Sequence, residues 1–256
     1  MKILKRTVAA LATAALVVSA LVFLPVKALM PAIIVLAALV QLEYGQMVSR
    51  KYPTLVWGGV LAGALYLVST FYMSTGAPEV IVFALALAVL FSKTDKPIAA
   101  LATTVFGFVY IPLMLKYFVM IPAKFGGQNM LMLLYILAIV KISDMGGFAF
   151  GMAFGKHKMC PTISPGKSWE GLVGSIFASC VISCAFIKIT GFSIPKSLAF
   201  GVAAALVGTL GDLVESRIKR ECEVKDSATF MPAGMGGFLD MFDSILFAPA
   251  IFYYFL

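Results

Sequence analysis

A polar helical face follows the apolar run 194–211. Its members recur at the spacing i, i+3, i+4, i+7 and i+8, which places them on one side of a helix: Asp212, Glu215, Ser216, Lys219 and Arg220. The two cations also fit an ordinary helix end that lies at lipid headgroups. Asp212 does not, because a carboxylate at membrane depth is costly and is usually functional. The face therefore indicates a site that combines a carboxylate with a hydroxyl and cations.

Two further carboxylates open the last apolar segment. Asp240, Asp243 and Ser244 share one helical face. The two acids repel each other, and a divalent cation between them removes this cost. Acidic residues are also favoured in the first turn of a helix. This preference explains one of the two aspartates, but it explains less well why two of them occur among apolar neighbours. The pair therefore favours a metal site.

A third candidate lies inside the apolar segment 129–150. Lys141 and Asp144 are three residues apart and share a helical face. They form either a structural ion pair or part of the site, and the residues alone leave both interpretations open. Glycines follow at every fourth position, namely Gly147, Gly151 and Gly155. Their spacing predicts close packing against another helix.

The connection 155–171 is cationic and contains two prolines that limit its conformations. The run 166–168 resembles the end of a Walker A motif, but that motif needs a glycine where this chain has Pro161, so a P-loop is excluded. Lysines and hydroxyls in a stiff loop suit a phosphorylated ligand instead. We therefore take Ser164 and Lys167 as candidate phosphate-binding residues.

The three clusters and this loop share one kind of chemistry. Carboxylates at membrane depth, with hydroxyls and cations at the membrane face, are the groups that divalent-metal phosphate chemistry requires. Mg²⁺ binds one or two carboxylates and leaves its other positions to water and phosphate oxygens. Lysine and arginine neutralise the phosphate charge that remains. A site at the membrane surface suggests one lipid substrate and one soluble substrate.

The composition shows what kind of protein must position these residues. Of the 256 residues, 61% are hydrophobic and 12% are charged, about half the ~25% of soluble domains. The mean hydropathy is +1.00. These values exclude a soluble enzyme and a disordered chain. They predict an all-α, polytopic helical bundle in a lipid bilayer.

Nine apolar segments are compatible with helices, which predicts about nine transmembrane helices. They span residues 7–24, 28–42, 54–72, 79–91, 98–121, 129–150, 169–190, 194–214 and 238–256. With a cytoplasmic N-terminus, 14 lysines and arginines lie in cytoplasmic loops and three in outer loops, as the positive-inside rule requires. If the short segment 79–91 did not cross, the later loops would change sides and break this rule. The net charge of +8 thus indicates anionic headgroups and not nucleic acid as a partner.

The acidic residues divide the chain into two parts. The first 42 residues contain no Asp or Glu, and nine of the 12 acids follow residue 140. We therefore expect residues 1–128 to form an N-terminal scaffold of about five helices and residues 129–256 to form the catalytic domain. The cytoplasmic loops of this domain are expected at 151–168 and 215–237, so that the site faces the cytoplasm.

Several motifs of the C-terminal half form one combined signature. They are Ser143-Asp144, the run Pro161–Gly171, Gly211-Asp212-Leu213, Ser216-x-x-Lys219-Arg220-x4-Lys225-Asp226, Gly236-Gly237 and Asp240-x-x-Asp243-Ser244. This signature resembles that of the phosphatidate cytidylyltransferases, also called CDP-diacylglycerol synthases. The resemblance covers about residues 140–247, and the motifs are too long and specific to agree by chance.

The resemblance implies an enzyme of the inner (cytoplasmic) membrane that converts CTP and phosphatidic acid to CDP-diacylglycerol and pyrophosphate. It implies dependence on Mg²⁺, leaves room for a second, monovalent cation such as K⁺, and suggests a homodimer. Asp212 and Asp240 correspond to metal ligands of the family, and we expect Asp144 to be a third ligand. Asp243, Lys225 and Asp226 match further catalytic positions. The expected substrate-binding residues are Ser164, Lys167, Ser216, Lys219, Arg220 and Lys225.

The chain departs from the family pattern at three positions. Met235 stands where the family has histidine, with one extra residue before Gly236, and Met145 stands where a small hydroxyl residue is common. Met241 replaces the arginine of an Asp-Arg-x-Asp run. All carboxylates and most cations remain, so we expect an active enzyme.

Two other functions use some of the same residues. A CTP-dependent lipid-alcohol kinase would transfer the γ-phosphate and release CDP. A non-enzymatic membrane transporter would use Lys141, Asp144 and Asp212 as an ion relay, but it needs polar groups that are accessible from both faces. The predicted outer loops hold almost no charge, which disfavours the transporter.

Overall fold

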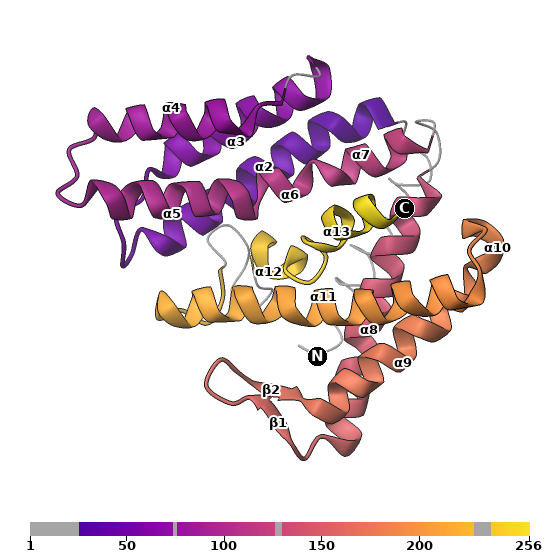
Figure 1. Cartoon of the computed structure of the whole chain (residues 1–256). Coiled ribbons are helices and arrows are strands. Elements are labelled where there is room, and N and C mark those ends of the chain that lie inside the picture. Colours follow the sequence, from indigo (N-terminus) through magenta and orange to yellow (C-terminus); the bar gives the residue numbers. More distant parts are fainter. Residues whose placement is uncertain (1–25, 74–75, 126–129, 228–236) are drawn as a thin grey trace, which may run out of the picture.

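The computed structural model describes residues 26–73, 76–125, 130–227 and 237–256. These residues form an almost entirely helical molecule with one short β-hairpin (Figure 1). The predicted first segment, 7–24, and the family position Met235 lie outside the described residues.

The N-terminal half folds into helices that follow the predicted apolar segments. They are α2 (Val26–Val48), α3 (Val56–Tyr72), α4 (Pro78–Leu90), α5 (Pro97–Tyr110), α6 (Pro112–Leu115) and α7 (Tyr117–Lys124). The predicted segment 98–121 is interrupted at Ile111, because Pro112 has no N–H to continue the helix and instead starts a new one.

The C-terminal half contains the longest helices and the hairpin. Its elements are α8 (Leu131–Phe154), β1 (Lys158–Cys160), β2 (Ser164–Ser168), α9 (Trp169–Ala185), α10 (Ile187–Thr190), α11 (Ile194–Glu221), α12 (Phe238–Phe242) and α13 (Ala248–Phe255). The expected loops at 151–168 and 215–237 are shorter than predicted. Helix α8 continues to Phe154, α11 continues to Glu221, and the strands β1 and β2 pair antiparallel.

The last apolar segment, 238–256, does not form the single helix that we predicted. It is divided into α12, with five residues, and α13, with eight. At about 1.5 Å per residue, α13 is about 12 Å long, far less than the ~30 Å core of a bilayer. Asp243 and Ser244 end α12, and Pro249 lies in the first turn of α13. Apolar composition indicated burial correctly but did not reveal this break.

Among the described residues, four helical stretches are long and apolar enough to cross a membrane: Lys27–Val48, Pro97–Lys124, Leu131–Phe154 and Ile194–Glu221. Three shorter apolar helices accompany them, namely α3, α4 and α9. Large apolar side chains lie exposed on the outer faces of α3, α4, α8, α9 and α11. These features are those of an all-α, multi-pass membrane protein.

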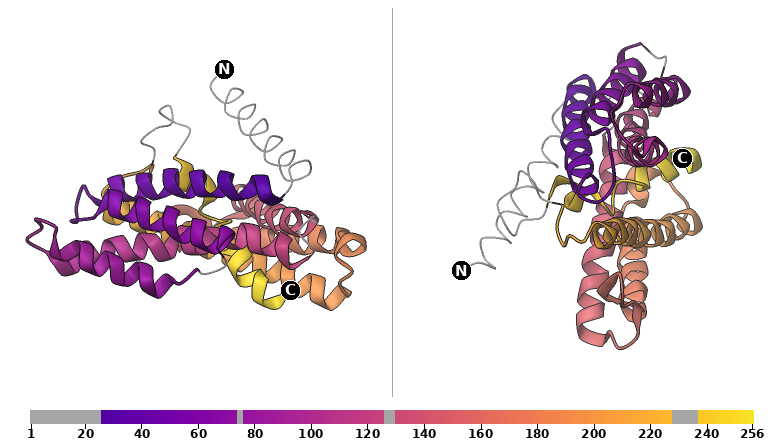
Figure 2. Two further views of the ribbon diagram at one scale, coloured as in Figure 1. Left: turned by 90° about the horizontal axis from the view of Figure 1, so that it is seen from above. Right: turned by 90° about the vertical axis from the view of Figure 1, so that its left-hand side faces the viewer.

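Helices α2, α3 and α4 and the stretch α5–α7 alternate in direction along the chain (Figure 1). The connections that follow α2 and α4, and the end of α11, lie at one end of the molecule, on the left of Figure 1. The C-terminal ends of α3, α7 and α10 lie toward the opposite end. Helix α11 lies between the N-terminal helices and the α8–α9 pair (Figure 2). Fully buried Tyr66, Phe108, Tyr135 and Leu239 belong to a core that joins the two halves.

Glycines allow α8 and α9 to pack closely, as their spacing predicted. A Cβ atom on Gly147 would lie 2.3 Å from the Oγ of Ser175, and one on Gly174 would lie 2.4 Å from the Phe150 side chain. Both distances are too short for a real contact. The close packing of α8 and α9 holds the start of α9, and with it the hairpin, beside the C-terminal part of α8.

Candidate metal and phosphate site

A cavity of 670 Å³ opens between α8, the hairpin, α11 and α12. It is lined by six of the residues expected from the sequence: Asp144, Ser164, Lys167, Asp212, Asp240 and Asp243. Lys141, Lys158 and Ser244 are among its other polar lining residues. The structure therefore brings together residues from four motifs that are far apart in the sequence.

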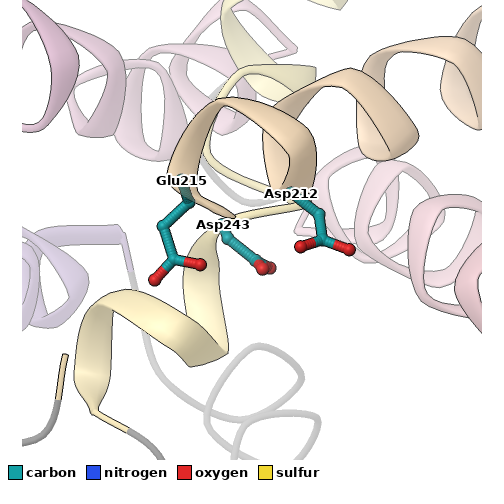
Figure 3. Close-up of side chains that lie close together, drawn as sticks. All are labelled: Asp212, Glu215 and Asp243. Carbon is teal, nitrogen blue, oxygen red and sulfur yellow. The ribbon is translucent and has the colours of Figure 1, made fainter. Parts of the chain in front are cut away.

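Three carboxylates converge beside this cavity (Figure 3). Oxygen atoms of Asp212, Glu215 and Asp243 all lie within 4.8 Å of one another. Helix α11 supplies the first two, and the turn after α12 supplies the third. Three oxygen donors at this spacing suit a hard divalent cation such as Mg²⁺, which prefers carboxylate ligands. The donor set thus fits the metal that the sequence predicted.

Glu215 was not among the predicted site residues, although it was recognised on the polar face. Its side chain is fully buried, and Oε2 pairs with the Lys219 Nζ at 2.5 Å. The available signal was its position one helical turn after Asp212, which places both carboxylates on one face. Glu215 lies outside the family motif, whose matched positions in this region are Asp212, Ser216, Lys219 and Arg220.

Gly211 allows the two parts of the acidic cluster to approach each other. A Cβ atom at this position would lie 2.5 Å from the Asp243 carbonyl oxygen, so no other residue fits without a backbone shift. A larger side chain at position 211 would push α11 away from the turn that carries Asp243. The carboxylates of Asp212 and Asp243 would then lie farther apart.

We therefore predict that Gly211→Ala lowers turnover about a hundredfold, because displacements of about 1 Å at a reacting site have effects of this size. Turnover by purified protein in detergent measures this change. Leu210→Ala is the matched control, since Leu210 is 59% exposed and faces outward. Equal activity of the two variants would contradict the close-approach argument.

Strand β2 carries Lys167 to the acidic cluster. The Lys167 Nζ lies 2.8 Å from Asp212 Oδ2 and donates to the Thr209 carbonyl oxygen at 2.8 Å. The other Asp212 oxygen accepts a hydrogen bond of 3.2 Å from the Ser216 hydroxyl. The predicted residues Lys167, Asp212 and Ser216 thus form one connected group at the cavity.

Asp240 is held more firmly than the other acids. Its Oδ1 lies 2.6 Å from the Lys219 Nζ, and its Oδ2 accepts hydrogen bonds from the backbone N–H groups of Ser227 and Gly237. Lys219 therefore bridges Asp240 and Glu215. Together these contacts fix the start of α12 against α11.

A carboxylate from the N-terminal half also positions α12. Glu43 on α2 is fully buried, and its Oε2 accepts a 3.1 Å hydrogen bond from the Leu239 backbone N–H. A carboxylate at a helix N-terminus compensates its exposed N–H groups. The predicted scaffold of residues 1–128 therefore contributes a side chain that helps place Asp240 and Asp243, which the sequence analysis did not anticipate.

The remaining predicted residues lie outside the cavity. Arg220 is exposed, and its Nε donates to the Ile163 carbonyl oxygen of the hairpin at 3.3 Å. Lys225 and Asp226 are exposed on the stretch that follows α11, next to residues that are not described. The structure does not bring these two residues to the acidic cluster.

The C-terminal end of α11 is tied to the end of α2. Lys51 Nζ donates to the Glu221 carbonyl oxygen at 2.9 Å, and the Tyr52 hydroxyl donates to a Glu221 carboxylate oxygen at 2.5 Å. The hydrogen bond to Glu221 raises the pKa of the Tyr52 hydroxyl. This link joins the two halves of the chain at the end of α11 that carries Lys219 and Arg220.

Comparisons with known proteins show which family the chain belongs to. A model of the cytidylyltransferase family matches residues 4–256. A Haemophilus influenzae protein named phosphatidate cytidylyltransferase is 41% identical over 139 residues, which cover 50% of this chain and 46% of the relative. A Mycobacterium tuberculosis protein of the same name is 41% identical over 149 residues, with coverage of 57% and 44%.

A Staphylococcus aureus protein, again named phosphatidate cytidylyltransferase, is 44% identical over 117 residues and is matched over 45% of each chain. The chain spans about half the length of the curated relatives it matches. The family match extends over nearly all residues and confirms the resemblance found in the sequence. The chain therefore belongs to the cytidylyltransferase family.

Proposed function

We propose that the protein transfers the cytidylyl group of CTP to phosphatidic acid, giving CDP-diacylglycerol and pyrophosphate. The main support is the single cavity in which Asp144, Asp212, Asp240, Asp243 and Lys167 meet. Such a cavity offers oxygen ligands for a metal and a cation for a phosphate. The names of the relatives support the choice of substrates.

The carboxylates would hold a divalent cation, for which we propose Mg²⁺. Asp212 and Asp243 offer oxygen atoms at a suitable spacing, Asp144 and Asp240 line the same cavity, and Glu215 is close to the first two. When bound, Mg²⁺ neutralises phosphate charge and orients the phosphate groups. The family resemblance leads us to include a second, monovalent cation such as K⁺ in the proposal.

The chain's own residues would bind and orient the two substrates. In the proposed reaction, a phosphate oxygen of phosphatidic acid attacks the α-phosphorus of CTP, and pyrophosphate leaves. Phosphoryl-type transfer depends mainly on positioning and charge neutralisation, so it needs no protein nucleophile. We assign the binding of phosphate groups to the cations and hydroxyls named from the sequence: Ser164, Lys167, Ser216, Lys219, Arg220 and Lys225. Arg220 and Lys225, and Asp226 as a catalytic position, lie outside the cavity and are included in the proposal on the family resemblance alone.

The assay uses purified protein with CTP labelled at the α-phosphate, Mg²⁺ and phosphatidic acid. We expect the label in a nucleotide-lipid product and an equal amount of pyrophosphate. A parallel reaction contains a lipid alcohol in place of phosphatidic acid, and release of CDP with a phosphorylated lipid there, without a nucleotide-lipid in the first reaction, would favour the lipid-alcohol kinase and contradict the proposal. Absence of any chemical turnover would leave the transporter as the remaining candidate. Protein carrying Asp212→Asn serves as the negative control.

We also propose nine membrane passes with a cytoplasmic N-terminus in the inner membrane, the last pass being made by α12, the following turn and α13. The asymmetry of lysine and arginine between the loops supports this topology. The alternation of helix connections between two ends of the molecule agrees with it (Figure 1). The active site would then face cytoplasmic CTP. A homodimer is proposed on the family resemblance alone.

Single cysteines in a cysteine-free background test this topology. We predict that Glu223→Cys resists an impermeant thiol reagent in intact cells and reacts after permeabilisation, because Glu223 would lie on the cytoplasmic side. Its side chain is 81% exposed, so poor access within the fold does not explain resistance. Met73→Cys, 65% exposed at the opposite end, is the control and should react in intact cells. Labelling of the Glu223 variant from outside would overturn the topology.

A further inference from the structure

Lys141 is a cation within a membrane-spanning helix, and the proposed function has not used it. It lies on α8, lines the cavity, and has a side chain that is 46% exposed. Its Nζ donates to the Ser244 hydroxyl at 3.0 Å and to the Met241 carbonyl oxygen at 3.3 Å. The nearest Asp144 oxygen is 3.8 Å away.

These contacts differ from those of a closed structural ion pair. A charge in a membrane span is costly and is normally paired closely or directed to a polar cavity. Lys141 makes its two shortest contacts with neutral oxygen atoms, while its carboxylate partner is more distant. An ammonium group has three donors, and the open side of Lys141 lies toward the cavity. The cation is therefore held in place and still accessible to an anion.

Lys141 contacts Met241, a position at which the chain departs from the family pattern. In the family pattern, the residue at 241 is the arginine of an Asp-Arg-x-Asp run, and this chain has methionine there. The Lys141 Nζ touches the backbone of that same residue, on the cavity side of Asp240 and Asp243. A positive charge is thus present beside Asp240 and Asp243. In this chain it comes from Lys141 on α8, whereas in the family pattern it comes from an arginine at position 241 on α12.

We propose that Lys141 binds a phosphate group of one substrate and replaces the cation that Met241 lacks. The inference rests on the proposed function, since it assigns Lys141 to the same cavity. Either the CTP phosphates or the phosphate of phosphatidic acid can supply the oxyanion, because the chemistry of recognition is the same.

The experiment compares Lys141→Met, Lys141→Arg and the double variant Lys141→Met with Met241→Arg. We expect Lys141→Met to raise the KM for one substrate about tenfold to a hundredfold, the usual effect of losing a hydrogen bond to a charged group. A higher KM for CTP identifies the nucleotide phosphates, and a higher KM for phosphatidic acid identifies the lipid phosphate. Lys141→Arg should remain close to the natural protein.

The double variant tests the replacement of one cation by another. Arginine at 241 should recover most of the lost affinity, although it restores no contact on α8. Lys188→Met is the matched control, because Lys188 is an exposed lysine on α10, away from the cavity. Its KM values should not change.

Other results would overturn the inference. If Lys141→Met lowers thermal stability but leaves both KM values unchanged, the lysine is structural. If arginine at 241 gives no recovery, the two positions are not equivalent. An inactive natural protein would instead contradict the proposed function, so the two failures are distinguishable.

Discussion

Asp212→Asn is expected to lower turnover about a hundredfold to a thousandfold while the protein remains folded. A metal ion at a phosphoryl centre contributes several kcal/mol to transition-state stabilisation, and each 1.4 kcal/mol corresponds to a tenfold change in rate. Asp212 belongs to the three-carboxylate cluster, pairs with Lys167 and accepts a hydrogen bond from Ser216. Asparagine keeps the shape and one acceptor oxygen but loses the charge.

Two measurements separate a metal role for Asp212 from a folding role. Turnover as a function of Mg²⁺ concentration reports on the site, and thermal unfolding in detergent reports on the fold. Asp95→Asn is the matched control, because Asp95 is an exposed carboxylate between α4 and α5, away from the cavity. If Asp212→Asn and Asp95→Asn have equal activity at ordinary Mg²⁺, Asp212 is not a metal ligand.

The second large effect is expected for Asp240→Asn, which should abolish measurable turnover at ordinary Mg²⁺. Asp240 lines the cavity and also holds Lys219 and two backbone N–H groups. Asparagine can still accept the backbone hydrogen bonds through its single carbonyl oxygen, so α12 is expected to form. It can neither neutralise Lys219 nor offer an anionic oxygen to a metal.

A titration with Mg²⁺ shows which of these two losses dominates. Partial recovery at high Mg²⁺ would indicate that Asp240 is a metal ligand, as the sequence predicted. No recovery at any concentration would indicate that its main task is to place Lys219 and α12. Near-normal turnover at ordinary Mg²⁺ would contradict both roles.

The sequence predicted those parts of the site that depend on local spacing. Asp212 and Ser216 share a helical face through the helical period, and Gly147 indicated close packing because small residues at helical spacing allow it. Lys167 was identified because a cation next to prolines and hydroxyls suits phosphate. These signals operate over a few residues, and a sequence contains them directly.

The sequence did not predict features that depend on contacts between distant parts of the chain. Glu43 was assigned to a scaffold because nothing near it in the sequence shows that it meets Leu239. The break between α12 and α13 was hidden by an apolar composition that continues through both helices. Glu215 could have been identified from its spacing, but its burial against Lys219 and its approach to Asp243 require the folded structure.

The hydrogen bond between Glu43 and Leu239 has a consequence for how the protein is made. Its partners are separated by 196 positions in the chain. At about 5–20 residues per second, a ribosome needs roughly 10–40 s to add that length. Helix α2 is therefore made well before Leu239, whose backbone N–H helps to hold the Glu43 carboxylate in the folded protein. A chain that stops before residue 238 lacks both α12 and the acid of the following turn. Asp240 and Asp243 are thus the last of the cavity's acids to be synthesised, and the cavity is complete only after both have been added.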